Sequence, residues 1–126
     1  MRWLLALSAL SGFLAVALGA FGAHGLKGRV SSLPDGARRL EWWQTAASYQ
    51  LAHALAIGLA ALLADQLPGH AMCSAGVAFL IGTLLFSGSL YVMGLTGLRA
   101  LGAITPLGGL AFLVGWGCLL WAALRP

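Results

Sequence analysis

The chain has 126 residues, of which 60% are hydrophobic and 8% are charged, and its formal net charge is +4. Because a soluble domain carries about 25% charged residues, this composition excludes an ordinary soluble protein and predicts an integral membrane protein. The positive charges flank apolar runs or lie in one connecting segment, 27–40. This placement is typical of helix ends held at lipid headgroups, and it argues against a nucleic-acid partner.

Four apolar segments are long enough to cross a bilayer, since a hydrocarbon core of about 30 Å needs about 20 helical residues. We therefore expect an all-α fold: a single domain, residues 1–126, forming an integral membrane bundle of four transmembrane helices with short loops. The approximate spans are 3–26, 41–64, 72–98 and 106–124.

The first span could instead be a secretory signal peptide, because Arg2 precedes an apolar run and small residues surround Ala23. However, the apolar run continues to Leu26, which is longer than the apolar region of a typical signal peptide. We expect a retained helix.

Segment 27–40 is the only substantial loop. Pro34 and Asp35 are typical of a helix start, so the second helix could begin near Asp35, ahead of its membrane span. At the last span, Thr105 can cap the helix and Pro106 suits its first turn.

Counting Lys and Arg predicts the orientation. The face with segments 27–40 and 99–105 carries five of these residues, and the face with both termini and the 65–71 turn carries two. The positive-inside rule then places the 27–40 loop in the cytoplasm and both termini outside.

Small side chains recur along one face of three spans. Because helices in lipid gain little from hydrophobic burial, they associate by close packing over such residues. We expect helix contacts at these positions, although a ligand groove floored by glycines is the alternative. The glycines concerned are Gly12, Gly19, Gly82, Gly108 and Gly115.

Polar side chains gather in the half of the bundle nearest to the 27–40 loop. In lipid such groups must find partners, so they mark the polar interior of the protein. The candidate cluster consists of His24, Glu41, Thr45, Tyr49, Gln50, His53, Ser87, Ser89, Tyr91 and Thr105.

This cluster has two interpretations. In the structural one the groups satisfy one another: His53 could bond Tyr49 or a hydroxyl on the third helix, and Glu41 could pair with Arg99. In the functional one they form a half-open polar vestibule that binds a small ligand, with His24 and His53 as titratable members.

Metal, cofactor and catalytic sites have little support in the sequence. No third His or Cys stands at ligand spacing from His53, and His70 lies in the turn on the opposite face. Cys73 and Cys118 are expected to be two buried thiols. No acidic residue lies in the middle of a span, and the GxSxG, HExxH and GxxxxGK[ST] motifs are missing. We expect no enzymatic activity, no cofactor and no metal.

Several motifs occur in order along nearly the whole chain: GAFGAHGL at 19–26, WQTA at 43–46, YQ at 49–50, HALA at 53–56, LFSGSLY at 85–91 and GAITPLGG at 102–109. Together they resemble the "domain of unknown function 423" family, also called UPF0382. The resemblance implies a small multi-pass protein of the bacterial inner (plasma) membrane. It brings no established activity, so no catalytic residue is carried over.

These observations predict a non-enzymatic helical bundle that acts as a homo-oligomer or as an accessory subunit of a membrane complex. Its partners would be the lipid bilayer and either further copies of itself or another membrane protein. The alternative is a channel, carrier or binder for a small solute, ion or lipid, using a vestibule around His24, His53 and Tyr91. A membrane-embedded enzyme is a third possibility and rests only on the His, Tyr and Ser side chains of the cluster.

Overall fold

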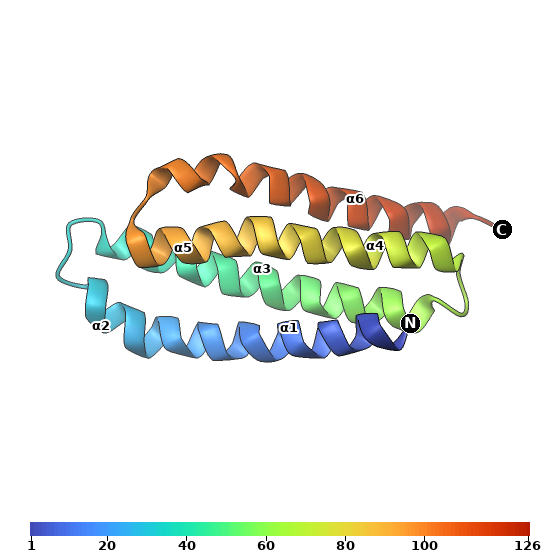
Figure 1. Cartoon of the computed structure of the whole chain (residues 1–126), viewed down its shortest axis with the longest axis horizontal. Helices are drawn as coiled ribbons and strands as arrows, with labels where there is room; N and C mark the ends of the chain where they lie inside the picture. The colour runs from blue at the N-terminus through green and yellow to red at the C-terminus, as the bar shows by residue number, and fades with distance from the viewer.

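The computed structural model describes residues 1–126 and consists of helices joined by short connections, with no strand. Both chain termini lie at one end of the molecule, and the 31–35 loop lies at the other (Figure 1). The prediction of an all-α protein with four transmembrane helices is confirmed. The four segments long and apolar enough to cross a membrane are Arg2–Val30, Gly36–Leu63, Gly69–Thr96 and Arg99–Leu124.

Three of these segments contain a turn that is not α-helical. Two π-helical turns, η1 and η2, interrupt the first and third segments, and a 3₁₀ turn, η3, begins the fourth. In chain order the elements are α1 (Arg2–Phe21), η1 (Gly22–Leu26), α2 (Lys27–Val30), α3 (Gly36–Leu63), α4 (Gly69–Gly82), η2 (Thr83–Ser87), α5 (Gly88–Thr96), η3 (Arg99–Ala103) and α6 (Thr105–Leu124).

The helix ends follow local sequence signals with one exception. α3 begins at Gly36, directly after Asp35, and so starts well ahead of its apolar span. α5 ends at Thr96, and the next residue, Gly97, has a φ of +73°, a left-handed conformation that glycine adopts without strain. The expectation that Thr105 caps the last helix is wrong. Thr105 is the first residue of α6 and makes no capping bond, because its hydroxyl is engaged with Ser89.

Each of the four membrane-spanning segments forms one rod. Two rods lie at the centre of the bundle and two at its periphery. α3 contacts α1 on one side and the α4–α5 rod on the other, and α6 packs against α4 and η2 (Figure 1). In the most apolar stretch of each rod, 44% of residues are buried in the two central rods, but only 17% in the first rod and 22% in the last. The first and last rods therefore present most of their surface to the bilayer or to a partner.

The contact between α4 and α6 depends on missing side chains. A Cβ added at Gly108 would lie 2.3 Å from the backbone nitrogen of Phe86, and one at Gly82 would lie 2.4 Å from a ring carbon of Phe112. At Gly115 the nearest ring carbon of Phe79 would be 2.5 Å away. These three glycines let the two helices approach closely enough for the phenylalanine rings to fill the space between them.

Gly12 and Gly19 of α1 both face α3, although less tightly. A Cβ at Gly12 would lie 3.9 Å from Ala54, and one at Gly19 would lie 3.8 Å from Ala47. Both distances are ordinary van der Waals contacts. The α1–α3 contact therefore has room for alanine where the α4–α6 contact has none.

The apolar core lies in the half of the bundle near the termini. Its largest fully buried side chains include Leu4, Ile57, Met72 and Phe79, which come from α1, α3 and α4. Two smaller apolar clusters, around Trp43 and around Met93, lie in the other half, where polar side chains add hydrogen bonds between the helices.

Candidate functional site

One polar group joins the first, second and third rods. The hydroxyl of Tyr91 donates to Oε1 of Gln50 at 2.6 Å. The amide nitrogen of the same glutamine donates to the backbone oxygen of Ser11 at 3.1 Å and contacts its hydroxyl at 3.4 Å. Gln50 and Ser11 are both buried, so each would lose stability without its partner. Gln50 thus connects α1 to α5 through α3.

A second group joins α3 to α6 around His53. Nδ1 of His53 lies 2.8 Å from the backbone oxygen of Tyr49, and the indole N–H of Trp116 donates to Nε2 at 3.2 Å. A carbonyl oxygen can only accept and an indole N–H can only donate, so Nδ1 carries the hydrogen and Nε2 accepts. This arrangement holds a neutral imidazole with both nitrogens engaged.

The His53 ring is also part of an aromatic stack. Its centroid lies 3.6 Å from that of Phe112 with an interplanar angle of 11°, and Phe79 and Trp116 pack around it at 5.5 and 6.1 Å. The side chain is buried. The imidazole is therefore held by two hydrogen bonds and three neighbouring aromatic rings.

A third group consists of two serines near the η2 turn. Ser87 donates to the backbone oxygen of Ala46 at 2.8 Å, which ties η2 to α3. Ser89 bonds the hydroxyl of Thr105 at 2.6 Å, which ties α5 to the start of α6. The hydroxyl of Ser89 also donates to the backbone oxygen of Phe86 at 2.9 Å. Each serine bonds a neighbouring rod, and every buried side-chain nitrogen and oxygen in the protein has a hydrogen-bond partner.

The remaining residues of the predicted cluster make no side-chain hydrogen bond with these three groups. His24 is exposed in η1, Glu41 is exposed near the start of α3, and Thr45 is half-buried. Glu41 forms no ion pair with Arg99, contrary to the expectation, because the two side chains lie around a hollow instead of in contact. The phenol ring of Tyr49 is 44% exposed and packs against Phe86.

The structure therefore does not gather His24, His53 and Tyr91 into one vestibule. His24 is exposed, His53 faces α6, and Tyr91 faces Gln50 and Trp43. The polar interior is divided into three groups that each join different helices. The hydrogen bonds of the three groups agree with the structural interpretation, and binding of a small ligand by part of the cluster stays a hypothesis.

Three hollows lie along this half of the protein, and the smallest, of about 260 Å³, is lined by Lys27, Val30, Ser31, Gly36, Ala37 and Leu40. The charged hollow, of about 500 Å³, is lined by Pro34, Asp35, Ala37, Arg38, Glu41 and Arg99. The aromatic groove, of about 630 Å³, lies between α3, η2 and α6, and its walls include Tyr49, His53, Phe86, Phe112 and Trp116. Only the groove contains a histidine, and that imidazole is already engaged on both nitrogens.

Besides Ser11 and Trp116, three further structural residues are missing from the predicted cluster. Ser8 donates to the backbone oxygen of Ala54 at 2.8 Å, and the indole N–H of Trp43 donates to that of Leu18 at 2.6 Å. Both bonds hold α1 to α3. The repeated small residues of the first span place Ser8 on its packing face, whereas nothing in the sequence indicates the partner of Trp43.

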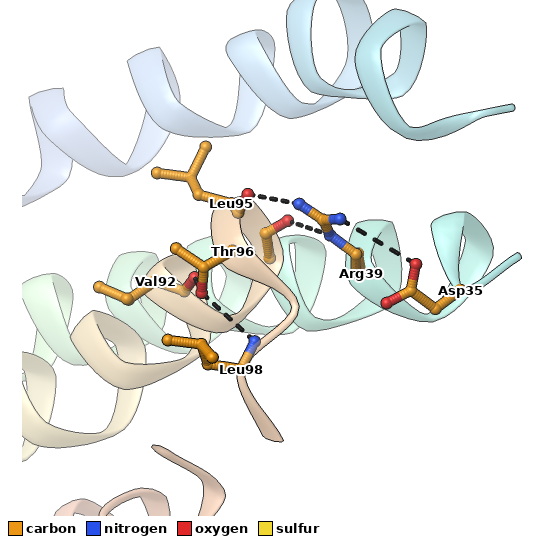
Figure 2. A network of polar contacts seen from close by, with 7 residues as sticks. Asp35, Arg39, Val92, Leu95, Thr96 and Leu98 are labelled. Atoms are coloured by element: carbon orange, nitrogen blue, oxygen red, sulfur yellow. Dashed lines mark hydrogen bonds and ion pairs between the residues drawn. The ribbon is translucent and has the colours of Figure 1, made fainter. Parts of the chain in front are cut away.

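Arg39 is the third of them, and Figure 2 shows its surroundings. Its Nε donates to the backbone oxygen of Gly94 at 2.9 Å and a terminal nitrogen donates to that of Leu95, so the guanidinium caps the last turn of α5. The other terminal nitrogen lies 4.0 Å from a carboxylate oxygen of Asp35, the residue directly before α3. The sequence showed Arg39 only as one of several basic loop residues.

The titratable and sulfur-containing side chains form no further cluster. No group of three or more His, Cys, Asp and Glu side chains is placed to hold a metal ion. Cys73 and Cys118 are free thiols, and both are partly exposed where the sequence had suggested burial.

Comparison with known proteins identifies the family. The family model described as "Protein of unknown function (DUF423)" matches residues 18–109. The chain is 44% identical to the "UPF0382 membrane protein YwdK" of Bacillus subtilis over 99% of this chain and 98% of the relative. It is 45% identical to the "UPF0382 inner membrane protein YgdD" of Escherichia coli K12 over 98% of this chain and 91% of the relative. No solved structure matches. The chain therefore belongs to the DUF423 (UPF0382) family of membrane proteins.

Proposed function

We propose that this protein is a non-enzymatic membrane bundle that works by association, either with further copies of itself or as an accessory subunit of a larger membrane complex. We place it in the bacterial inner membrane with the 27–40 loop in the cytoplasm and both termini outside. The observation that carries the proposal is the contrast between a fully satisfied interior and uncovered outer helices.

The satisfied interior supports a role without chemistry. A general base, a nucleophile or an ion ligand needs a polar atom that is free to meet a substrate. In this protein the buried polar atoms bond one another, and Gln50 and His53 connect neighbouring helices. Such bonds stabilise a membrane bundle by about 0.6 kcal/mol each on average.

The outer face of α1 supports association. Phe13 on this face is 72% exposed and Val16 is 64% exposed. Ala9 and Ala17, one turn before and one turn after Phe13, are exposed as well. Small residues on either side of a large one let a second helix approach while the ring inserts beside it. A face of this kind suits a helix from another subunit.

Cysteine crosslinking in native membranes tests the association. Cys73 and Cys118 are replaced by alanine, and single cysteines are then introduced at Ala9 or Ala17. We expect both variants to form a disulfide-linked dimer, or a crosslinked product with one defined partner, on mild oxidation. The matched control is Ala15→Cys, because Ala15 lies on the same helix but is buried against α3.

Two results would contradict the proposal. One is that neither the Ala9→Cys nor the Ala17→Cys variant forms a dimer or a crosslinked product with a partner. The other is equal crosslinking at Ala15, which would mean that the products arise from random collision of partly unfolded chains.

A second candidate function, binding of a small solute or lipid, is favoured by the aromatic groove. Part of the ring of Tyr49 is exposed there, and the groove opens between helices without disturbing the core. This candidate predicts that filling the groove abolishes binding while the fold persists. A groove-filled variant that binds as well as the parent protein would rule it out.

A further inference from the structure

We infer that the charged hollow and the aromatic groove together form a site for one phospholipid with a phosphoethanolamine headgroup. The headgroup would lie in the charged hollow and one acyl chain in the aromatic groove. This inference rests on the second candidate function and names its ligand. It involves α3, η3 and α6, so it does not depend on the outer face of α1.

The charges of the hollow match a zwitterionic headgroup. Arg38, Arg99 and Glu41 line the same hollow, and none of them forms an ion pair. Asp35, the other carboxylate of the lining, faces Arg39 (Figure 2). Two guanidinium groups suit the phosphate, because guanidinium binds phosphate oxygens with paired hydrogen bonds. Glu41 is then left for the ammonium group.

Glu41, a carboxylate without an ion-pair partner, distinguishes between the possible headgroups. A glycerol headgroup brings no cation of its own, so with both arginines engaged by the phosphate it would leave Glu41 without a positively charged partner, which is unfavourable. A choline headgroup carries a positive charge but no N–H to donate to the carboxylate. Ethanolamine supplies both a positive charge and three N–H donors. The hollow therefore fits ethanolamine better than glycerol or choline.

The two hollows lie on the same side of α3. At 100° per residue, Arg38, Glu41 and Tyr49 fall within about 80° around the helix axis. Arg38 lines the charged hollow, and Tyr49 lines the aromatic groove. A molecule that follows this side of α3 from the membrane surface meets the charges first and the rings next.

The spacing along the helix matches one leaflet of a bilayer. Arg38 and His53 are separated by about 22 Å at 1.5 Å per residue. Half of a bilayer, headgroups included, is about 20–22 Å thick. A phosphate bound at Arg38 would therefore place the end of its acyl chain beside His53, with Leu110 and Leu113 of α6 along the opposite wall.

The experiment measures lipid retained by the purified full-length chain in native mass spectrometry. The probes are dioleoyl phosphatidylethanolamine, phosphatidylcholine and phosphatidylglycerol, which share their acyl chains. We expect one phosphatidylethanolamine molecule to be retained in preference to the other two. Arg38→Gln with Arg99→Gln should weaken its retention roughly 30-fold, because each arginine near a membrane surface contributes about fivefold.

Two further variants separate the headgroup from the acyl chain. Glu41→Gln should lose the preference for phosphatidylethanolamine and leave phosphatidylglycerol bound at least as well. Gly109→Phe should weaken all three lipids about tenfold, equivalent to roughly two buried methylene groups. Gly109 lines the groove, and a Cβ there would meet no atom within 4 Å, so a side chain at this position starts in open space within the groove.

Matched controls make each result decisive. Gly117→Phe adds the same ring on the same helix, outside the aromatic groove and in a separate hollow beside His70 and Trp121. Arg29→Gln removes a charge from the same end of the protein but lines neither hollow. Lipid retention is compared only among variants whose melting temperature matches that of the parent protein. If Gly109→Phe lowers the melting temperature, Gly109→Leu is used in its place.

Three outcomes would overturn the inference. If Arg29→Gln weakens retention as much as the double arginine variant, the lipid is held by overall charge. If phosphatidylethanolamine is retained no better than phosphatidylcholine, the headgroup assignment is wrong, although a loss caused by Gly109→Phe would leave the second candidate function standing. If Gly109→Phe leaves retention unchanged, or if Gly117→Phe weakens it as much, the effect does not come from an acyl chain in the aromatic groove.

Discussion

The indole N–H of Trp116 and Nε2 of His53 meet across the α3–α6 contact at 3.2 Å. Because the other imidazole nitrogen lies 2.8 Å from the backbone oxygen of Tyr49, the ring is held in one neutral tautomer. A histidine in a membrane span often marks a route for protons or ligands. Here the observed contacts of the imidazole form a polar connection between two helices.

The glycines of α6 differ sharply in the space around them, and this gives the first prediction. A Cβ at Gly108 would lie 2.3 Å from the backbone of Phe86, whereas one at Gly109 would meet no atom within 4 Å. Gly108→Ala should separate α6 from η2 and lower the free energy of unfolding by about 1–3 kcal/mol. Gly109→Ala, the matched control, should be neutral or stabilising by up to about 1 kcal/mol.

Thermal unfolding in detergent micelles or steric trapping in bilayers measures the difference between the two variants. Equal stability of both proteins would mean that α6 does not approach η2 as closely as described.

The guanidinium of Arg39 caps α5, and its neighbour Arg38 bonds no backbone atom. Arg39→Gln should therefore destabilise the end of α5, by about 1–2 kcal/mol for the loss of a charge-assisted cap. Arg38→Gln should leave this end unchanged. Hydrogen exchange of the amides in residues 88–98 reports the effect directly, and we expect faster exchange only in the Arg39 variant. Faster exchange in both variants would point to general electrostatics instead of a specific cap.

The proposed orientation predicts which loop positions an impermeant reagent can reach. In a protein without its two natural cysteines, Gln66→Cys in the α3–α4 turn should react with a charged maleimide in intact spheroplasts. Gly28→Cys in α2 should react only after lysis. Gly28 tolerates the change because a Cβ there meets nothing within 4 Å. The reverse labelling pattern would invert the topology and move the basic loop outside.

The spans could be predicted from the sequence because each depends only on the length and polarity of one segment. The pairing of polar groups could not. Trp116 lies in a stretch that reads as almost wholly apolar, so nothing indicated that its N–H would serve His53. The choice of partner depends on how each helix is rotated against its neighbour, which is a tertiary property.

The π-helical turns explain part of this loss of information. A face assigned at 100° per residue assumes an uninterrupted α-helix, whereas a π-helical turn holds extra backbone and changes the rotation of the residues beyond it. His24 lies within η1, and Ser89 and Tyr91 follow η2. The sequence therefore predicted the depth of these residues more accurately than the direction in which they point.

Arg39 illustrates the same limit for a charged residue. Its position beside the membrane surface follows from the sequence, and an anchoring role at the headgroups is the natural expectation. Its actual partners are the carbonyl oxygens of Gly94 and Leu95, about 55 residues further along the chain. Only the packing of α5 on α3 brings them within reach.

A double-mutant cycle between His53 and Trp116 tests most directly whether the polar interior serves to hold the helices together. His53→Phe and Trp116→Phe keep an aromatic ring at each position and remove the hydrogen bond between them. We expect each single variant to lower the free energy of unfolding, and the double variant to lose about 0.6 kcal/mol less than the sum of the two. Single variants as stable as the parent protein, with additive effects in the double variant, would contradict the account.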